Sequence, residues 1–266
     1  GRKVTSPITS DIMDDTPLRK ELVKAFRSGL GGTGWLANTV RPDIAFAQSR
    51  ISQHMANPTE GAYRALVHLM RYLCHYPNRG ISAPIHGESE PVWRFFSDSD
   101  HGGNKELANR GRAQLGLLAT FNGAPVTWKS TVSSTAVAHP KMTEAHADTS
   151  SGASEIFATS NASKEFLYVS YIIEELGLTP VTLPLRMEVD STTAESFIKN
   201  TCAKTRLKHI DQRQNWVLAL RDQSVIEPVH VGTLENGADY FTKIQGGEGT
   251  RRFAHMFMCD SVMPEE

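Results

Sequence analysis

The stretch VWRFFSD at Val92–Asp98 joins large apolar residues to a closing acid, the pattern of a buried β-strand that ends at a polar edge. Two more strand-like runs follow it, at Gln114–Phe121 and Ala124–Lys129. The dipeptide Asn122-Gly123 lies between them and is a strong signal for a two-residue hairpin turn. Together these runs predict a meander of three antiparallel strands.

The chain beyond this meander predicts alternating helices and strands. A long helix is expected first, followed in order by a strand, two helices, a strand and a short helix, at Ser151–Leu176, Pro184–Val189, Thr193–Asn200, Arg206–Arg221, Val225–Val231 and Asn236–Lys243. Strands that are reached through helices, added to a meander, predict an α/β fold with a mixed five-stranded sheet flanked by helices. The sequence lacks the Gly-rich first turn and the strict βαβ alternation of a dinucleotide-binding fold.

A small helical segment is expected before the sheet. Its first helix carries Leu22, Phe26 and Leu30 on one side, and the pair Gly31-Gly32 is expected to interrupt it. A second helix is expected over Pro42–Met55, and a third begins with Asn57 as its N-cap. We therefore divide the chain into a disordered lead-in (1–16), a helical segment (17–80), an α/β domain (90–245) and a C-terminal tail (246–266).

Composition narrows the functional class. The 266 residues are 39% hydrophobic and carry a formal net charge of -1, which is ordinary for a globular protein and less basic than a typical duplex-binding module. Bound metal ions could supply the positive charge that such a module needs at phosphates. Three cysteines without a CxxC pair favour reduced thiols in an intracellular compartment, cytoplasm or nucleus, and no apolar run is long enough for a membrane span.

Four acidic residues lie at the ends of predicted strands or near the starts of predicted helices, positions that are typical of metal-binding and catalytic carboxylates. Asp98 and Asp190 each close a predicted strand, whereas Glu155 and Asp239 each lie near the start of a predicted helix. Taken singly, an aspartate after a strand can simply cap a turn. Four converging carboxylates would repel one another by roughly 4 kcal/mol per pair at 4 Å, and hard cations such as Mg²⁺ or Mn²⁺ would remove that penalty. Whether the four converge depends on the fold.

An ordered series of motifs resembles the end of the polyproteins of copia-type LTR retrotransposons. Residues 35–47, with their RPDI sequence, and residues 57–73 resemble the last helices of the reverse transcriptase in that family. Five later stretches resemble its ribonuclease H domain, at Ser97–Asp100, Gly123–Ser130, Val189–Asp190, Thr205–Arg213 and Ala238–Lys243. The similarity covers roughly residues 20 to 245.

The resemblance implies a ribonuclease H-like fold and hydrolysis of the RNA strand of an RNA–DNA hybrid. It implies that Asp98, Glu155, Asp190 and Asp239 act as catalytic residues and hold two Mg²⁺ ions, for which Mn²⁺ can substitute. Lys129, Arg206 and Lys208 are candidates for neutralising hybrid phosphates, with solvated surface charge as the alternative. The remainder of a reverse transcriptase or a host complex is an expected protein partner.

Two residue assignments and two alternative functions stay open at the level of the sequence. Glu144, in the stretch Thr143–His146, competes with Glu155 for the second acidic position, and Asp100 is either a further ligand or a turn residue. The stretch Arg112–Gly116 lacks the small hydroxyl residues common in the family. A domesticated, catalytically inactive structural or assembly subunit is therefore the alternative to a nuclease, and an integrase-type strand transferase fits the motifs less well.

Overall fold

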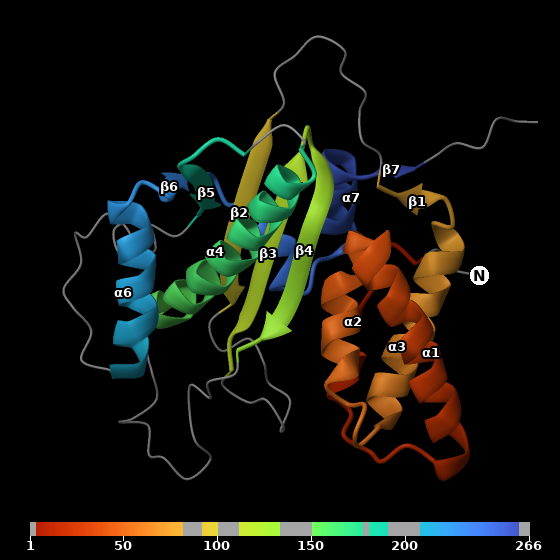
Figure 1. Ribbon diagram of the computed structural model, residues 1–266. Helices are drawn as coiled ribbons and strands as arrows, with labels where there is room; N and C mark the ends of the chain where they lie inside the picture. The colour runs from red at the N-terminus through yellow and green to blue at the C-terminus, as the bar shows by residue number, and fades with distance from the viewer. Residues whose placement is uncertain are drawn as a thin grey trace, which may run out of the picture.

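The computed structural model describes residues 4–81, 92–100, 112–133, 151–177, 181–190 and 208–260 (Figure 1). Its main sheet has the strand order β4-β3-β2-β5-β6. The strands are β2 (Trp93–Asp100), β3 (Gln114–Phe121), β4 (Ala124–Val132), β5 (Leu185–Val189) and β6 (Ile226–His230). The meander β2-β3-β4 is antiparallel, whereas β5 runs parallel to both β2 and β6. The predicted α/β fold with a mixed five-stranded, ribonuclease H-like sheet is confirmed.

The hairpin between β3 and β4 forms for the reason that its sequence indicates. Asn122 and Gly123 both have positive φ angles, of 49° and 84°. A tight turn with this twist matches the right-handed twist of the strands that it joins. The Asn122 side chain also accepts a hydrogen bond of 2.8 Å from the backbone N–H of Val92, which ties the turn to β2.

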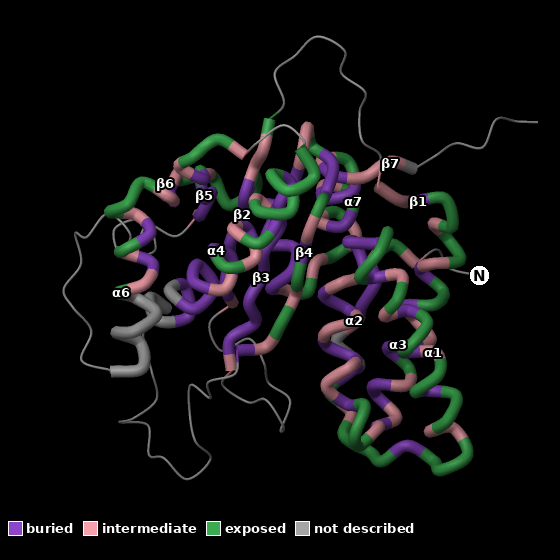
Figure 2. The backbone as a smooth tube through the Cα atoms, in the orientation of Figure 1, coloured by how far each residue is buried: buried purple, intermediate pink, exposed green. Residues whose placement is uncertain are grey.

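Both faces of the sheet are covered. Neighbouring residues in a strand point to opposite faces, so Phe95 packs under α4 (Ser151–Glu175) and α6 (Lys208–Asp222), and Phe96 packs under η5 (Gly237–Phe241) and α7 (Gly247–Phe257). Figure 2 shows the consequence in β3, which is buried along almost its whole length. The central strands therefore form a rigid floor on which side chains can be held in place.

The helical segment lies beside β4 and has a core of its own (Figure 1). It consists of η1 (Ser10–Met13), α1 (Lys20–Thr39), η2 (Pro42–Ile44), α2 (Ala45–Ser52) and α3 (Glu60–His75). Its core includes Phe26, Leu30 and Leu66. After α3, β1 (Arg79–Gly80) pairs with β7 (Cys259–Asp260), so the segment also contacts the end of the described chain.

Two local predictions for these helices are wrong. Gly31-Gly32 does not interrupt α1, because the burial of Leu30 and Thr33 on either side offsets the roughly 1 kcal/mol by which each glycine disfavours a helix. The N-cap of α3 is Thr59 rather than Asn57. The Thr59 side chain accepts a hydrogen bond of 3.1 Å from the Ala62 N–H, and its backbone forms a bridge with Pro17 that delays the helix.

The lead-in and the tail also differ from expectation. Ile8 and Ile12 are almost fully buried against the helical core instead of being disordered. Residues 247–257 form α7, whose Phe253 and Phe257 complete the core beneath η5. The helix expected at Thr193–Asn200 falls outside the described residues. Within the described parts of the chain, every helix is too short or too polar to cross a bilayer.

Candidate metal centre

Two of the candidate carboxylates are placed by adjacent strands. Phe96 of β2 lies opposite Glu188 of β5 in a parallel pair, so two residues further on Asp98 comes level with Asp190. The carboxyl ends of parallel strands meet at one edge of a sheet, where side chains point into a common space. Asp98 is 2% exposed, and Asp190 is partly exposed just beyond the end of β5.

Asp239 reaches the same place from η5. Gly116 pairs with Asp98 across β2 and β3, and a Cβ atom at this glycine would lie 2.6 Å from the Ala238 carbonyl oxygen. The absence of a side chain there lets η5 lie directly on the sheet. Asn236 caps η5 and donates a hydrogen bond of 3.2 Å to the Ser97 carbonyl, next to Asp98.

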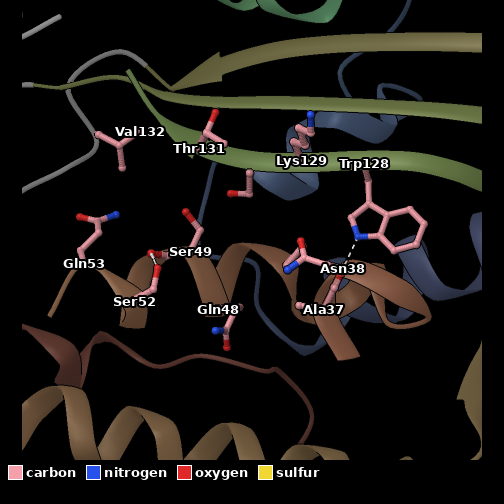
Figure 3. A pocket seen from close by; sticks show the side chains of 12 residues that line it. Ala37, Asn38, Gln48, Ser49, Ser52, Gln53, Trp128, Lys129, Thr131 and Val132 are labelled. Carbon is pink, nitrogen blue, oxygen red and sulfur yellow. Dashed lines mark hydrogen bonds between the residues drawn. The ribbon is translucent and has the colours of Figure 1, made fainter. Parts of the chain in front are cut away.

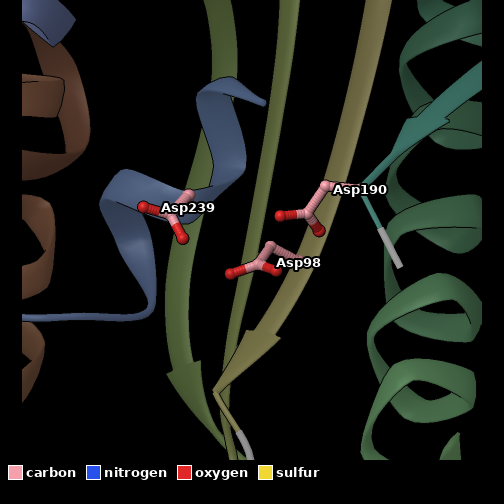
Figure 4. A group of neighbouring side chains, drawn as sticks. All are labelled: Asp98, Asp190 and Asp239. Atoms are coloured by element: carbon pink, nitrogen blue, oxygen red, sulfur yellow. The ribbon is translucent and has the colours of Figure 1, made fainter. Parts of the chain in front are cut away.

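The three aspartates form one cluster. Each of Asp98, Asp190 and Asp239 offers a carboxylate oxygen, and these oxygens all lie within 4.8 Å of one another. Figure 4 shows the three side chains pointing toward a shared space from β2, from the end of β5 and from η5. Residues separated by up to about half of the chain are thus brought together by the strand register and by the close packing of η5.

Glu155 lies next to this cluster without joining its innermost group. It is 8% exposed, near the start of α4. Burial raises its pKa to about 8, and the Asp98 and Asp190 carboxylates push that pKa in the same direction, so the side chains interact. The competing residue, Glu144, lies outside the described residues. The assignment of Glu155 as the second acidic ligand stays a prediction.

The electrostatics of the cluster are those of crowded negative charge. Burial raises the pKa of Asp98 to about 6, and Asp190 and Asp239 add to the rise while Lys243 and a hydrogen bond from Thr242 oppose it. The Thr242 hydroxyl donates to Asp98 Oδ2, and Gln245 donates a hydrogen bond of 2.7 Å to Asp239 Oδ2. Lys243 forms an ion pair with Asp239.

The donor set fits a hard divalent cation. The metal-ligand atoms that the three aspartates offer are all carboxylate oxygens, and oxygen ligands of this kind select Mg²⁺ or Mn²⁺ over softer metals. Three acids whose oxygens lie within 4.8 Å of one another, with a raised pKa at buried Asp98, are an arrangement that a bound cation would stabilise strongly. Asp100 is the last residue of β2 rather than a turn residue, and among the described residues it is not part of the innermost group.

Of the three residues that are candidates for binding nucleic acid, the structure describes the side chain of Lys129 alone. Lys129 lies on β4, is half-exposed and forms an ion pair with Glu165 of α4. It also lines a groove of about 500 Å³ between β4 and the helices α1 and α2. Figure 3 shows polar side chains, among them Asn38, Ser49 and Gln53, on the helical side of this groove, with the Trp128 indole donating to the Ala37 carbonyl at one end. Arg206 falls outside the described residues, and the side chain of Lys208, at the start of α6, is not described.

Sequence reasoning missed the residues that support the cluster. Thr242 and Lys243 follow Asp239 by three and four positions, a spacing that can bring side chains to one face of a helical turn. That spacing is a weak signal by itself. Gly116 carried no signal, because its role depends on a contact with η5 far away in the sequence, and Asn236 signalled only the start of a helix rather than its hydrogen bond to Ser97.

The chain is related over most of its length to the Pol polyproteins of plant transposons. It is 28% identical over 221 residues to the retrovirus-related Pol polyprotein from transposon TNT 1-94 of Nicotiana tabacum, a match that covers 82% of this chain and 15% of that protein. Identity to the polyprotein from transposon RE1 of Arabidopsis thaliana is 28% over 239 residues, covering 90% of this chain and 15% of that protein. For RE2 of the same plant it is 26% over 224 residues, covering 82% and 14%. The chain thus matches about a seventh of these relatives, and it matches no protein-family profile.

Proposed function

We propose, from the kinship with transposon Pol polyproteins, that this chain is a Mg²⁺-dependent endonuclease that hydrolyses the RNA strand of RNA–DNA hybrids. It would act as the ribonuclease H part of a copia-type, retrotransposon-derived polyprotein. The observation that carries the proposal is the cluster of Asp98, Asp190 and Asp239 at one edge of a ribonuclease H-like sheet.

The protein's own residues have distinct tasks in this reaction. Asp98 stands on a buried central strand and is oriented by Thr242, so it is the most rigidly held ligand. Asp190 and Asp239 approach from either side, and Glu155 adds a fourth carboxylate from α4. When bound, a pair of Mg²⁺ ions supplies Lewis-acid stabilisation of the attacking and the leaving oxygen of a phosphodiester. The carboxylates would hold and orient that pair, and the positive charge of the ions would offset the repulsion between the carboxylates and an anionic backbone.

The groove beside β4 is a candidate path for the hybrid. Asp98 lies opposite Gly116, and Gly116 lies opposite Ser130, so Ser130 is two strands away from the cluster, or roughly 10 Å. Around the groove, Lys129 offers positive charge, whereas Ser49 and Thr131 offer hydroxyl groups. Such groups suit sugar and phosphate contacts, which dominate the recognition of A-like duplexes by shape.

A hybrid-cleavage assay tests this function. The full chain is incubated with a duplex whose RNA strand is end-labelled, with Mg²⁺ or with EDTA. We expect Mg²⁺-dependent cleavage of the RNA strand that Asp98→Asn abolishes while the circular dichroism spectrum is retained. Asp222→Asn is the matched control, because Asp222 is an exposed carboxylate on α6 that pairs with the neighbouring Arg221. Equal turnover in the wild type and the Asp98→Asn variant would refute the assignment.

The inactive-subunit alternative is not favoured. A retained scaffold without catalysis has no need to keep three carboxylates within 4.8 Å of one another at a cost in repulsion. The two roles are separated by a metal titration. An inactive subunit would bind no Mn²⁺ at millimolar concentration, whereas a nuclease would bind it and lose that binding in Asp98→Asn.

A further inference from the structure

Lys243 places a positive charge inside the carboxylate cluster. Its ammonium group forms an ion pair with Asp239 Oδ1 and lies 4.0 Å from Asp98 Oδ2. The lysine is thus a charged neighbour of two of the three clustered aspartates.

The position of this ammonium conflicts with that of a divalent cation. Both oxygens of Asp239 have partners, since Lys243 contacts Oδ1 and Gln245 donates to Oδ2. A cation shared between Asp98 and Asp239 would have to approach the oxygens that face each other, which is where the ammonium stands. Two positive charges at that distance repel each other, so the ammonium and the divalent ion cannot share the space at low cost.

The lysine is able to leave. Its side chain is 43% exposed, whereas the Asp98 side chain beside it is 3% exposed. A lysine ammonium is carried on a flexible four-carbon stem and is strongly hydrated, so it can swing into water without moving the backbone of η5. The carboxylates, in contrast, are fixed by β2 and by the capped turn that holds Asp239.

We propose that Lys243 is the resident counter-cation of this site, bridging Asp98 and Asp239 in the metal-free protein and competing with the divalent ion for the same oxygens. The inference rests on the proposed function and adds to it a residue that regulates how tightly the metal is held. Lys243 is in this sense a positioning residue, because it keeps the aspartates together until a divalent ion displaces it.

The proposal predicts the sign of a change in metal affinity. Removing a competing charge strengthens the binding of the ion, whereas removing a group that merely orients Asp239 weakens it. Mn²⁺ is titrated by calorimetry into the metal-free full chain as wild type, Lys243→Gln, Lys243→Arg and Lys164→Gln. Lys164 is an exposed lysine on α4, packed over Trp216, and its substitution changes the net charge equally.

We expect Lys243→Gln to bind Mn²⁺ roughly three- to tenfold more tightly than the wild type, a change typical of removing one partly exposed charge partner. Lys243→Arg and Lys164→Gln should stay near the wild-type affinity. In EDTA, Lys243→Gln should also melt at a lower temperature than the wild type, and Mn²⁺ should remove that difference. Unchanged or weaker Mn²⁺ binding in Lys243→Gln would overturn the proposal.

The same titration, with Asp98→Asn added to the set of proteins, separates the two proposals. If Asp98→Asn abolishes Mn²⁺ binding while Lys243→Gln leaves it unchanged, the metal site stands and the role of the lysine fails. If the wild type binds no Mn²⁺ but Lys243→Gln does, the competing lysine is supported directly. If none of these proteins binds Mn²⁺, both the lysine proposal and the metal-dependent nuclease are refuted.

Discussion

At the scale of single residues, the orientation of Asp98 depends on one hydroxyl group. Thr242 donates to Asp98 Oδ2, and its hydroxyl also lies 3.1 Å from the Asp239 carbonyl oxygen. We expect Thr242→Val, which keeps the shape and removes the hydroxyl, to weaken Mn²⁺ affinity or to slow hybrid cleavage by roughly 10- to 100-fold, as is usual for groups that orient metal ligands. Thr242→Ser should restore most of the loss. A Thr242→Val protein with wild-type affinity and turnover would show that the sheet alone orients Asp98.

The raised pKa values predict how stability depends on pH in the metal-free protein. The pKa of Asp98 is raised to about 6 and that of Glu155 to about 8, both mainly by burial. In the folded state these groups hold protons that the unfolded chain has already released, so stability is lost as the pH rises through these values. We expect the melting temperature in EDTA to fall between pH 5 and pH 8, and the stabilisation by Mg²⁺ to be larger at pH 8. A Glu155→Gln variant should show a shallower fall, and an equally steep one would exclude Glu155 as its source.

The candidate acids were accessible to sequence reasoning, whereas their supporting residues were not. Asp98 closes a clearly predicted strand, and the surrounding stretch Ser97–Asp100 resembles a motif of the ribonuclease H domain in copia-type polyproteins. The contact between Thr242 and Asp98 joins residues 144 positions apart, and no local pattern encodes it. Lys243 was visible only as a charge after an acidic motif. Its significance appears once strand register and the packing of η5 bring Asp98 and Asp239 together.

At the scale of elements, the approach of η5 to β3 depends on Gly116. A Cβ atom at this position would meet the Ala238 carbonyl at 2.6 Å and the Thr242 methyl group at 2.8 Å. We expect Gly116→Ala to destabilise the fold by about 1–3 kcal/mol, the usual cost of overpacking, and to weaken Mn²⁺ binding because Asp239 moves with η5. Chemical denaturation and metal titration measure the two effects.

Gly31→Ala is the matched control for that substitution. Gly31 lies inside α1, and a Cβ atom there would have no neighbour within 4 Å. The change should therefore stabilise the protein by roughly 0.5–1 kcal/mol through helix propensity and leave metal binding unaltered. If both glycine variants behaved alike, the close approach of η5 to the sheet would not be what Gly116 permits.

Element prediction succeeded where a local rule was sufficient and failed where tertiary packing decided. The Asn122-Gly123 turn formed as expected because both residues accept positive φ. The interruption expected in α1 and the start expected for α3 were wrong. Burial of the residues around Gly31-Gly32 keeps α1 continuous despite its two glycines. The β-bridge between Thr59 and Pro17 shifts the start of α3 to a later residue than expected. Neither effect is encoded within the helix concerned.

At the scale of the whole molecule, the helical segment and the sheet are joined by buried polar contacts. The Tyr240 hydroxyl, next to Asp239, donates a hydrogen bond of 2.9 Å to the Asp43 carbonyl in the RPDI stretch. The Asp43 carboxylate accepts two hydrogen bonds from Arg41 and one from Tyr72, and both Arg41 and Asp43 are nearly fully buried. The RPDI stretch thus forms a buried hydrogen-bonded cluster that contacts η5, the element that carries the candidate metal ligand Asp239. This arrangement raises the question of whether residues 17–80 and 90–245 are separate domains.

Asp43→Ala distinguishes a single cooperative unit from two domains. The substitution leaves the Arg41 guanidinium buried without its carboxylate partner, a change that typically costs 3–5 kcal/mol. Alanine keeps the Asp43 main-chain carbonyl that accepts from Tyr240, but loss of the carboxylate loosens the stretch that carries this carbonyl. We therefore expect one unfolding transition at a lower denaturant concentration and, in the folded fraction, weaker Mn²⁺ binding. Two independent domains would instead give a helical transition that moves and a sheet transition that stays, with Mn²⁺ affinity unchanged. Far-ultraviolet circular dichroism follows the helices of both parts, and tryptophan fluorescence in a Trp35→Phe background follows the sheet and its helices, because Trp35 lies on α1. Coincident curves from these probes would mean that the helical segment is part of the machinery that positions Asp239, so that a nuclease cut back to residues 90–245 would lose it.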